Sequence, residues 1–248
     1  MDRRLLELDL KTSLAALSDL LMPRVCISCG RRLLLQEKHL CLECLADLPL
    51  TRFSGRSHNP MADAFNAKIE AGGSPEGENY VHATALFFYK GGYRNITKAL
   101  KYRRGFGAGL HFSKMLASEL LKSGLYADVD AVVPVPLHRS RKWVRGYNQA
   151  SLIAREISSG LGAEQIDSLL ERTRRTKTQT ALLKEQKAAN VSGAFRVRKL
   201  PSSQPRHILL VDDVFTTGAT LYECYKALRA VYGPSTRISI ATLAVVDR

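Results

Sequence analysis

The chain has 248 residues, of which 45% are hydrophobic and 24% charged, and its formal net charge is +14. This ordinary globular composition excludes collagen-like, low-complexity and wholly disordered proteins. A chain of this length can also bury a sizeable core without disulfide bonds.

Leucines recur at helical spacing in residues 1–22 and predict an amphipathic helix. Such a helix packs against the rest of the chain, or alternatively against a partner or a membrane surface. Acidic and basic residues interrupt the segment, so it offers neither the roughly 20 apolar residues of a spanning helix nor the apolar stretch of a signal peptide. We therefore expect a cytoplasmic protein with no membrane span. The leucines are Leu6, Leu10, Leu14, Leu17 and Leu21.

Four of the five cysteines form two C-x-x-C pairs within residues 23–50, with eleven residues between the pairs. Two such pairs can place four thiolates around a tetrahedral zinc ion, which stabilises a fold and does no chemistry of its own. Disulfides are uncommon in the cytosol, and a pair of redox dithiols is the remaining alternative. We predict a structural zinc site formed by Cys26, Cys29, Cys41 and Cys44.

Residues 51–79 are rich in Gly, Ser, Asn and Pro and are predicted to be a linker or hood segment before a main domain over residues 80–248. Apolar strand-like runs at residues 81–89, 131–135, 207–211 and 237–245 alternate with helix-like runs at residues 93–102, 112–122, 148–158 and 219–231. This order predicts an α/β fold with a parallel sheet, whose ligand lies beyond the carboxyl ends of the strands. Cys224 falls in the last helix and is either a buried core cysteine or a reactive thiol.

The most informative motif occupies residues 208–220, where an apolar strand leads into two adjacent acids, a turn of hydroxyl and small residues, and a helix. Carboxylates at a strand end can accept hydrogen bonds from the vicinal hydroxyls of a sugar. Backbone amides of the turn and the helix N-terminus suit a phosphate. The motif resembles the signature with which type I phosphoribosyltransferases bind 5-phosphoribosyl-1-pyrophosphate (PRPP). The residues that this resemblance implies are Asp212, Asp213, Val214, Phe215, Thr216, Thr217, Gly218, Ala219 and Thr220.

The resemblance extends to the ComF family, in which a small N-terminal zinc ribbon precedes a phosphoribosyltransferase-type domain. Residues 133–137 and 145–149 are similar to that family's second block, and residues 179–195 to its third. Tyr89, Gly92, Lys101 and Gly105 are similar to the block before the first helix, whereas Lys187 stands where we expect an arginine. The family implies a type I phosphoribosyltransferase fold for this chain.

Positive charge is concentrated where the resemblance places the pyrophosphate. Residues 139–199 contain fourteen basic and five acidic residues, and residues 90–104 contain six basic and no acidic ones. In type I enzymes a loop like residues 137–147 meets the pyrophosphate and its Mg²⁺, and here Arg145 is the best candidate, with Lys101 as a further one. A second loop, residues 172–187, is the candidate for closing over the site.

Two classes of function follow. The ComF resemblance implies a PRPP-binding protein with structural zinc that acts with single-stranded DNA and the DNA-uptake machinery in natural transformation. Cations interleaved with aromatics in residues 90–106, and Trp143, favour this class because such stretches hold a phosphate backbone and stack bases; alternatively the tyrosines are core or rim residues. The other class is an active phosphoribosyltransferase of nucleoside metabolism, which transfers phosphoribose to an acceptor and releases pyrophosphate. A PRPP-responsive regulator without catalysis is a third possibility.

Overall fold

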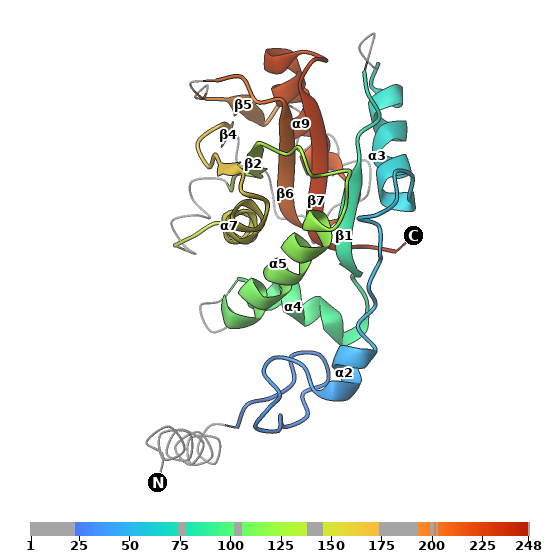
Figure 1. Cartoon of the computed structure of the whole chain (residues 1–248), viewed down its shortest axis with the longest axis vertical. Helices are drawn as coiled ribbons and strands as arrows, with labels where there is room; N and C mark the ends of the chain where they lie inside the picture. The colour runs from blue at the N-terminus through green and yellow to red at the C-terminus, as the bar shows by residue number, and fades with distance from the viewer. Residues whose placement is uncertain are drawn as a thin grey trace.

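The computed structural model describes residues 23–73, 78–101, 106–137, 146–173, 193–198, 201 and 203–247. Its centre is a parallel sheet of five strands in the order β1-β7-β6-β2-β3 (Figure 1). Valine, isoleucine, leucine and alanine fill the central strands and are almost wholly buried, as expected for a sheet covered on both faces. The strands are β1 (Ala83–Phe88), β2 (Ala131–Pro134), β3 (Glu164–Gln165), β6 (His207–Phe215) and β7 (Arg237–Val245).

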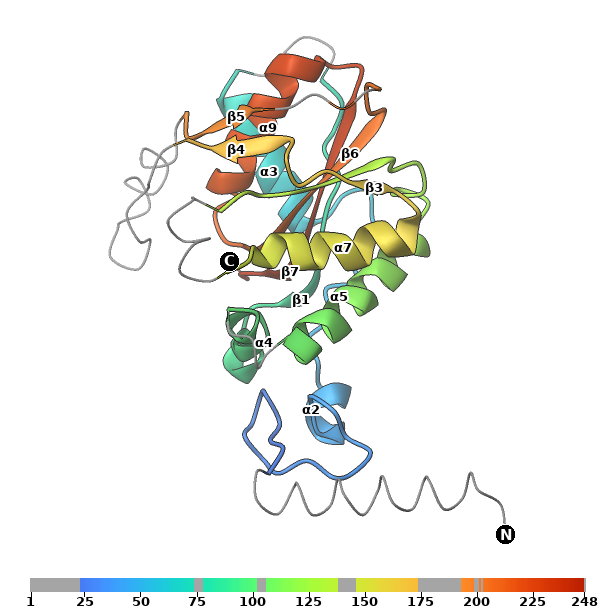
Figure 2. The same ribbon diagram turned by 90° about the vertical axis from the view of Figure 1, so that its left-hand side faces the viewer.

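Helices cover both faces of this sheet (Figure 2). One face packs against α5 (Phe106–Leu121) and α7 (Gln149–Leu161), and the other against α3 (Pro60–Ala71) and α9 (Ala219–Tyr232). Successive side chains of β6 therefore belong to different cores: Leu209 and Val211 face α5 and α7, while Leu210 faces α3 and α9. The predicted fold class, an α/β parallel sheet with a small N-terminal cysteine module, is confirmed.

Helix α3 lies within residues 51–79, the segment predicted to be a linker or hood, for which the sequence analysis assigned no helix. The Asn59 side chain accepts hydrogen bonds from the backbone amides of Met61 and Ala62, and Pro60 occupies the first helical position. The helix buries Met61, Phe65 and Ile69 against the sheet. Its packing makes this segment part of the main core.

The edge strand β1 is covered by the chain that leads into α3. The Thr51 amide donates to the Leu86 carbonyl at 3.1 Å, and the Phe88 amide donates to the Pro49 carbonyl at 2.8 Å. The side-chain amide of Asn59 donates to the Ala83 carbonyl at 2.9 Å. These bonds occupy an edge that would otherwise offer free backbone groups to another strand.

The cysteine module, with its short helix α2 (Leu42–Ala46), packs against the 3₁₀ turn η1 (Gly91–Tyr93) and α4 (Arg94–Ala99). The Tyr93 hydroxyl donates to the Cys44 carbonyl at 3.0 Å, and the Asn95 side chain donates to the Ile27 carbonyl at 3.1 Å. Gly92 is required at this contact, because a Cβ atom there would lie 2.1 Å from the Ser28 carbonyl oxygen. The module is therefore fixed at the end of the molecule toward which β1 runs (Figure 1).

A small antiparallel sheet completes the described fold. It joins β4 (Leu170–Arg172) to β5 (Phe195–Val197) and lies over α9. The predicted helix over residues 1–22 and most of the predicted closing loop over residues 172–187 lie outside the described residues. Within the part of the chain that is described, no helix is long and apolar enough to cross a membrane.

Candidate functional site

The four paired cysteines come together at the module. All four sulfur atoms lie within 4.8 Å of one another, and the Cys29 and Cys41 sulfurs are 3.8 Å apart. Cys26 and Cys41 are buried, whereas Cys29 is exposed. Each pair turns tightly: the Gly30 amide donates to the Cys26 carbonyl with Gly30 in the left-handed region, and the Leu45 amide donates to the Cys41 carbonyl. Four convergent sulfurs are a ligand set that could hold a metal ion and that zinc prefers.

Neighbouring groups lower the pKa of one of these four thiols. The backbone amide of Cys44 and, after it, the side chain of Arg31 lower the pKa of the Cys41 thiol to about 6. The lowered pKa favours the thiolate form of Cys41, which is the form that binds metal, while burial and the neighbouring thiols raise the pKa of Cys44. The buried Glu37 carboxylate accepts the amides of Leu34 and Leu42 at 2.7 and 2.8 Å and braces the loop between the two pairs.

The second candidate site is the carboxyl end of β6. Strand β6 continues through Asp212 and Asp213, and the Asp213 amide donates to the Asp212 carboxylate at 2.9 Å. The side chain of Asp213 also interacts directly with that of Asp212, and both side chains are partly buried. The two carboxyl groups are therefore neighbours at the strand end.

The turn after β6 has the geometry that the motif predicted. Gly218 is buried and adopts φ = 70°, and a Cβ atom there would lie 2.8 Å from the Phe215 ring. Only glycine fits both conditions, so the chain can turn directly from the strand into α9. Thr216 is exposed and Thr217 is partly buried beside it. Helix α9 begins directly after the turn, and the Ala219 amide donates to the Thr217 hydroxyl at 3.4 Å.

Asp212 lies in an unusual electrostatic environment. Burial and the neighbouring Asp213 carboxylate raise the pKa of Asp212 well above its usual range, while the positive charge of Arg172 acts in the opposite direction. Arg172 belongs to β4 and stacks over the Phe195 ring at 5.3 Å. Sequence analysis had placed Arg172 only at the start of a closing loop. No local pattern signals its proximity to Asp212, because that proximity depends on where the β4–β5 sheet packs.

Of the other residues predicted to contact phosphate, the structure describes Lys101. Lys101 is exposed directly after α4. The hydroxyl of Tyr147 donates to the carbonyl of the preceding Leu100 at 2.6 Å, which joins this point to the start of α7. Arg145 and residues 138–144 lie outside the described residues, as does Trp143. The structure therefore brings Lys101 beside the end of the predicted pyrophosphate loop.

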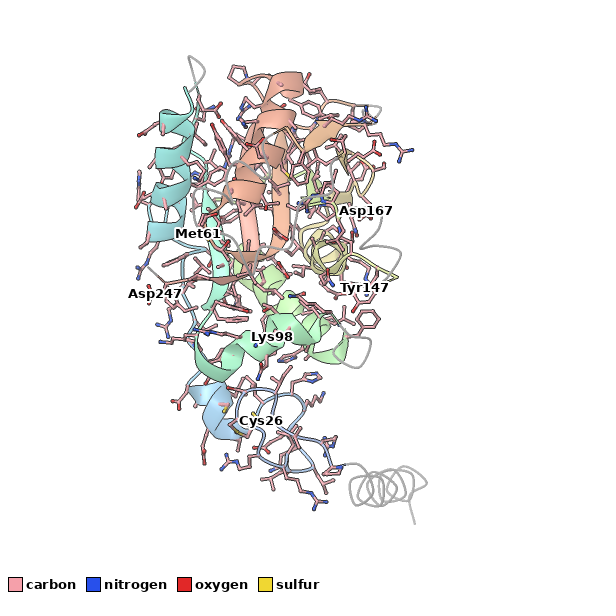
Figure 3. The ribbon with its side chains drawn as sticks, turned by 180° about the vertical axis from the view of Figure 1, so that it is seen from behind. Cys26, Met61, Lys98, Tyr147, Asp167 and Asp247 are labelled. Carbon is pink, nitrogen blue, oxygen red and sulfur yellow. The ribbon has the colours of Figure 1, made fainter. Side chains whose placement is uncertain are left out.

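Basic side chains line the exposed side of η1 and α4. Arg94, Lys98 and Lys101 follow one another at helical spacing, and all are exposed. Figure 3 shows Lys98 between the cysteine module, marked by Cys26, and the sheet domain. Tyr93 is not available for stacking on bases, because its hydroxyl donates to the Cys44 carbonyl and its partly buried ring packs against the core. The interpretation of the tyrosines as core or rim residues therefore holds for Tyr93.

A polar pocket of about 410 Å³ opens between the end of β2, the start of α7 and β4. Acidic and basic side chains line the pocket: Asp167 and Arg198 lie on its walls, and Arg172 lies on the side toward Asp212. Asn148, which caps α7, also lines it and donates to the Val135 carbonyl at 2.9 Å. The pocket thus lies next to the acidic end of β6. Unlike that strand end, it is lined by both basic and acidic side chains.

The parallel sheet and the four-cysteine cluster define the class: an α/β protein with a small metal-type cysteine module. Proteins of similar sequence define the class more closely. The chain is 40% identical over 101 residues to Competence protein F of Haemophilus influenzae and 37% identical over 133 residues to DNA utilization protein YhgH of Escherichia coli K12. It is 33% identical over 107 residues to Competence protein ComFC of Bacillus subtilis. The predicted resemblance to the ComF family is confirmed by these homologues.

The matches cover part of each chain. They span 40%, 52% and 43% of this protein and 44%, 57% and 41% of the three relatives, so they reach about half of each relative's length. No protein-family model matches the chain. Among solved structures, adenine phosphoribosyltransferases of Trypanosoma brucei and Leishmania donovani overlap with TM-scores of 0.31 and 0.28. Their sequence identities are 13% and 12%, and each match covers 62% of this chain and 68% of the other.

Proposed function

We propose that this chain binds PRPP at the end of β6, holds a structural zinc ion in its N-terminal module, and acts with single-stranded DNA in DNA uptake. The observation that carries the PRPP site is the turn at Gly218. A left-handed glycine with no room for a Cβ atom connects an acidic strand end to a helix N-terminus. In such a cradle a phosphate meets backbone amides while the adjacent carboxylates accept hydrogen bonds from sugar hydroxyls.

Each group of the ligand then has a partner in the chain. Asp212 and Asp213 accept hydrogen bonds from the ribose hydroxyls. The turn from Thr216 to Thr220 surrounds the 5-phosphate, and the hydroxyls of its threonines supplement the amides. The pyrophosphate, which travels with Mg²⁺, is met by Lys101 and by Arg145. Cations suit this role because they neutralise several phosphate oxygens at once.

The zinc proposal is supported by the convergence of the four sulfurs and by the low pKa of the Cys41 thiol. Zinc held by Cys26, Cys29, Cys41 and Cys44 has no open coordination position and therefore contributes folding energy alone. Its effect on function is indirect. The module packs against α4 through Tyr93 and Asn95, so zinc also fixes the helix that carries the exposed cations.

The DNA proposal rests on that row of cations together with the names of the relatives. Lys90, Arg94, Lys98 and Lys101 are exposed on one short stretch of chain at the carboxyl end of the sheet. A PRPP molecule needs few cations, so a longer polyanion accounts better for a row of this length. Binding of PRPP at the same end of the sheet would then compete with DNA or alter its affinity.

The PRPP site is tested by isothermal titration calorimetry with PRPP and Mg²⁺. Asp212→Asn combined with Asp213→Asn removes the carboxylates that accept the ribose hydroxyls, and we expect PRPP binding to be lost. Asp63→Asn, which removes an exposed carboxylate on α3, serves as the control and should bind normally. Unchanged affinity in the double variant would refute the site.

The DNA surface is tested by fluorescence anisotropy of a labelled single-stranded oligonucleotide at several salt concentrations, with and without PRPP and Mg²⁺. Two lost phosphate contacts reduce the slope of log K against log salt by about 1.4. We expect this reduction for Arg94→Gln with Lys98→Gln. The control is Arg206→Gln with Arg56→Gln, two exposed cations outside the row, and it should keep the slope. Equal slopes for the two double variants would exclude this row from DNA binding.

An active phosphoribosyltransferase is the second candidate, and the polar pocket beside Arg172 favours it because an acceptor needs its own site. In that reaction a nucleophile attacks C1 of the ribose, the C1–oxygen bond breaks, and pyrophosphate leaves with the bonding electron pair. The proton of the nucleophile passes to solvent or base. Release of pyrophosphate from PRPP is measured with nucleobases and with oligonucleotides, and Asp212→Asn with Asp213→Asn is the inactive control. Release that requires an acceptor supports the transferase, whereas PRPP binding without release supports a binding protein.

A further inference from the structure

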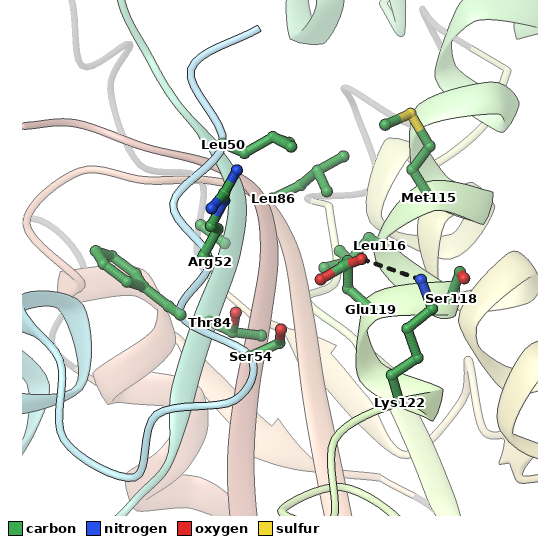
Figure 4. A pocket seen from close by; sticks show the side chains of 12 residues that line it. Leu50, Arg52, Ser54, Thr84, Leu86, Met115, Leu116, Ser118, Glu119 and Lys122 are labelled. Atoms are coloured by element: carbon green, nitrogen blue, oxygen red, sulfur yellow. Dashed lines mark ion pairs between the residues drawn. The ribbon is translucent and has the colours of Figure 1, made fainter.

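A second pocket, of about 220 Å³, lies at the β1 edge of the sheet and belongs to none of the sites above. It is enclosed by residues 50–54, the middle of β1 and the second half of α5 (Figure 4). Strand β7 separates β1 from β6 in the sheet, so this pocket is distinct from the acidic strand end.

The pocket is lined by apolar side chains and by a few polar ones. Hydrophobic side chains from all three segments line it, the hydroxyls of Ser54 and Thr84 belong to buried residues, and the charged side chains of Arg52 and Lys122 are exposed. Such a distribution is typical of sites for small organic molecules, in which apolar surface provides affinity and a few polar groups fix orientation. The apolar lining is Leu50, Phe53, Ala85, Leu86, Met115 and Leu116, and the polar lining is Arg52, Ser54, Thr84, Ser118, Glu119 and Lys122.

Arg52 is held in a conformation that arginine avoids. Its φ is 55°, and it is the one non-glycine residue with positive φ in the described ranges. The neighbouring Thr51 is fixed on both sides: its hydroxyl donates to the Ala85 carbonyl and accepts the Phe53 amide at 3.2 Å. Backbone strain that the surrounding structure maintains in this way is concentrated at ligand-binding sites. The strain here sets the direction of a cationic side chain at the mouth of the pocket.

The charge of Arg52 is not compensated within the described chain. Among the described residues, Arg52 forms no ion pair and no hydrogen bond through its guanidinium. The other cation that lines the pocket, Lys122, lies 3.6 Å from the Glu119 carboxylate and is neutralised by it (Figure 4). The pocket lining therefore carries one net positive charge.

We propose that this pocket binds a small organic monocarboxylate with an apolar body, such as an aromatic or short-chain acid. The carboxylate would pair with the Arg52 guanidinium, whose planar fork matches its two oxygens. The body would fill the space between Leu86 and Met115. An apolar cavity of roughly 150 Å³ accommodates benzene, so the volume here suits a body of about six to ten non-hydrogen atoms.

The test measures binding of benzoate to the full chain by saturation-transfer NMR and calorimetry, with benzyl alcohol and benzylamine as neutral and cationic analogues of the same size. We expect benzoate to bind at least tenfold more tightly than either analogue. Arg52→Gln should weaken benzoate binding at least tenfold, and Arg56→Gln, an exposed arginine four residues away outside the pocket, should leave it unchanged. Equal binding of the three probes, or equal loss in both variants, would overturn the proposal.

Two further variants separate the ligand site from folding. Arg52→Gly relieves the backbone strain and removes the cation, so we expect a higher melting temperature together with loss of benzoate binding. A lower melting temperature would contradict the strain argument. Met115→Trp fills the pocket and should abolish binding while the guanidinium remains. Benzoate affinity that survives this filling would place the ligand elsewhere and refute the assignment.

Discussion

The ion pair between Glu78 and Arg229 joins two segments that are 151 residues apart in sequence. The Arg229 Nη2 and Glu78 Oε1 atoms are 2.6 Å apart, and the two side chains are 7% and 5% exposed. Arg229 also donates to the carbonyls of Gly233 and Thr236, which hold the turn between α9 and β7. The ion pair thus joins the segment before β1 to the C-terminal end of α9.

Glu78→Gln keeps the shape of the side chain and removes its charge, so the guanidinium of Arg229 is left buried without a counter-ion. Removing one partner of a buried pair costs about 3–5 kcal/mol, and the retained amide favours the lower end. For a chain of this size each kcal/mol lowers the melting temperature by about 2–4 °C. We therefore expect a decrease of about 6–12 °C.

Circular dichroism melts of the wild type, Glu78→Gln and Arg206→Gln measure this effect. Arg206 pairs with Asp130 at 3.5 Å with its side chain 87% exposed, and surface pairs contribute about 0–1 kcal/mol. The control should therefore melt close to the wild type. If Glu78→Gln melts as the control does, burial does not strengthen this pair and the reasoning is wrong.

Three further outcomes follow from the described contacts. Cys26→Ser should release one zinc ion per chain and destabilise the module, as measured by a chromogenic zinc assay; full retention of zinc would contradict the ligand assignment. Burial lowers the pKa of His207, although its Nδ1 lies 2.8 Å from the Asp128 carboxylate. As pH falls, this histidine therefore takes up its proton at a higher pH in the unfolded chain than in the folded one. The urea midpoint should fall as pH decreases below about 6.5, and it should fall more for the wild type than for His207→Gln. Parallel pH profiles would show that His207 does not contribute to this pH dependence. The raised pKa of Asp212 has the opposite effect on the pH dependence of stability, because a charged Asp212 destabilises the folded state at neutral pH. Asp212→Asn should thus raise the urea midpoint at pH 7 although PRPP binding is lost, and a lower midpoint would show that the carboxylate stabilises the fold.

Features that depend only on neighbours along the chain were predictable from the amino-acid sequence. The run over residues 208–220 predicted a buried strand, a glycine turn and a helix, and β6, Gly218 and α9 follow in that order. An apolar run, a residue able to adopt positive φ and an amphipathic period are all local properties. The spacing of the four cysteines likewise predicted their convergence, because each pair closes a short turn.

Helix α3 shows where a local signal was present and was not recognised. Asn59 and Pro60 are typical of loops, yet they are also the capping residue and the first residue of a helix. The apolar residues Met61, Phe65 and Ile69 follow at helical spacing, and the glycine-rich composition around them masked that period. Only the packing of these side chains against the sheet decides between the two interpretations.

The remaining features depend on contacts between elements that are far apart in sequence. Arg172 acts on Asp212, Glu78 pairs with Arg229, and Arg52 adopts positive φ next to Thr51, which is hydrogen-bonded to the β1 edge. In each case the partner comes from an element distant in sequence. The order of strands in the sheet and the placement of helices on its faces create these contacts. Because that order minimises the free energy of the whole core, no local period along the chain can encode it.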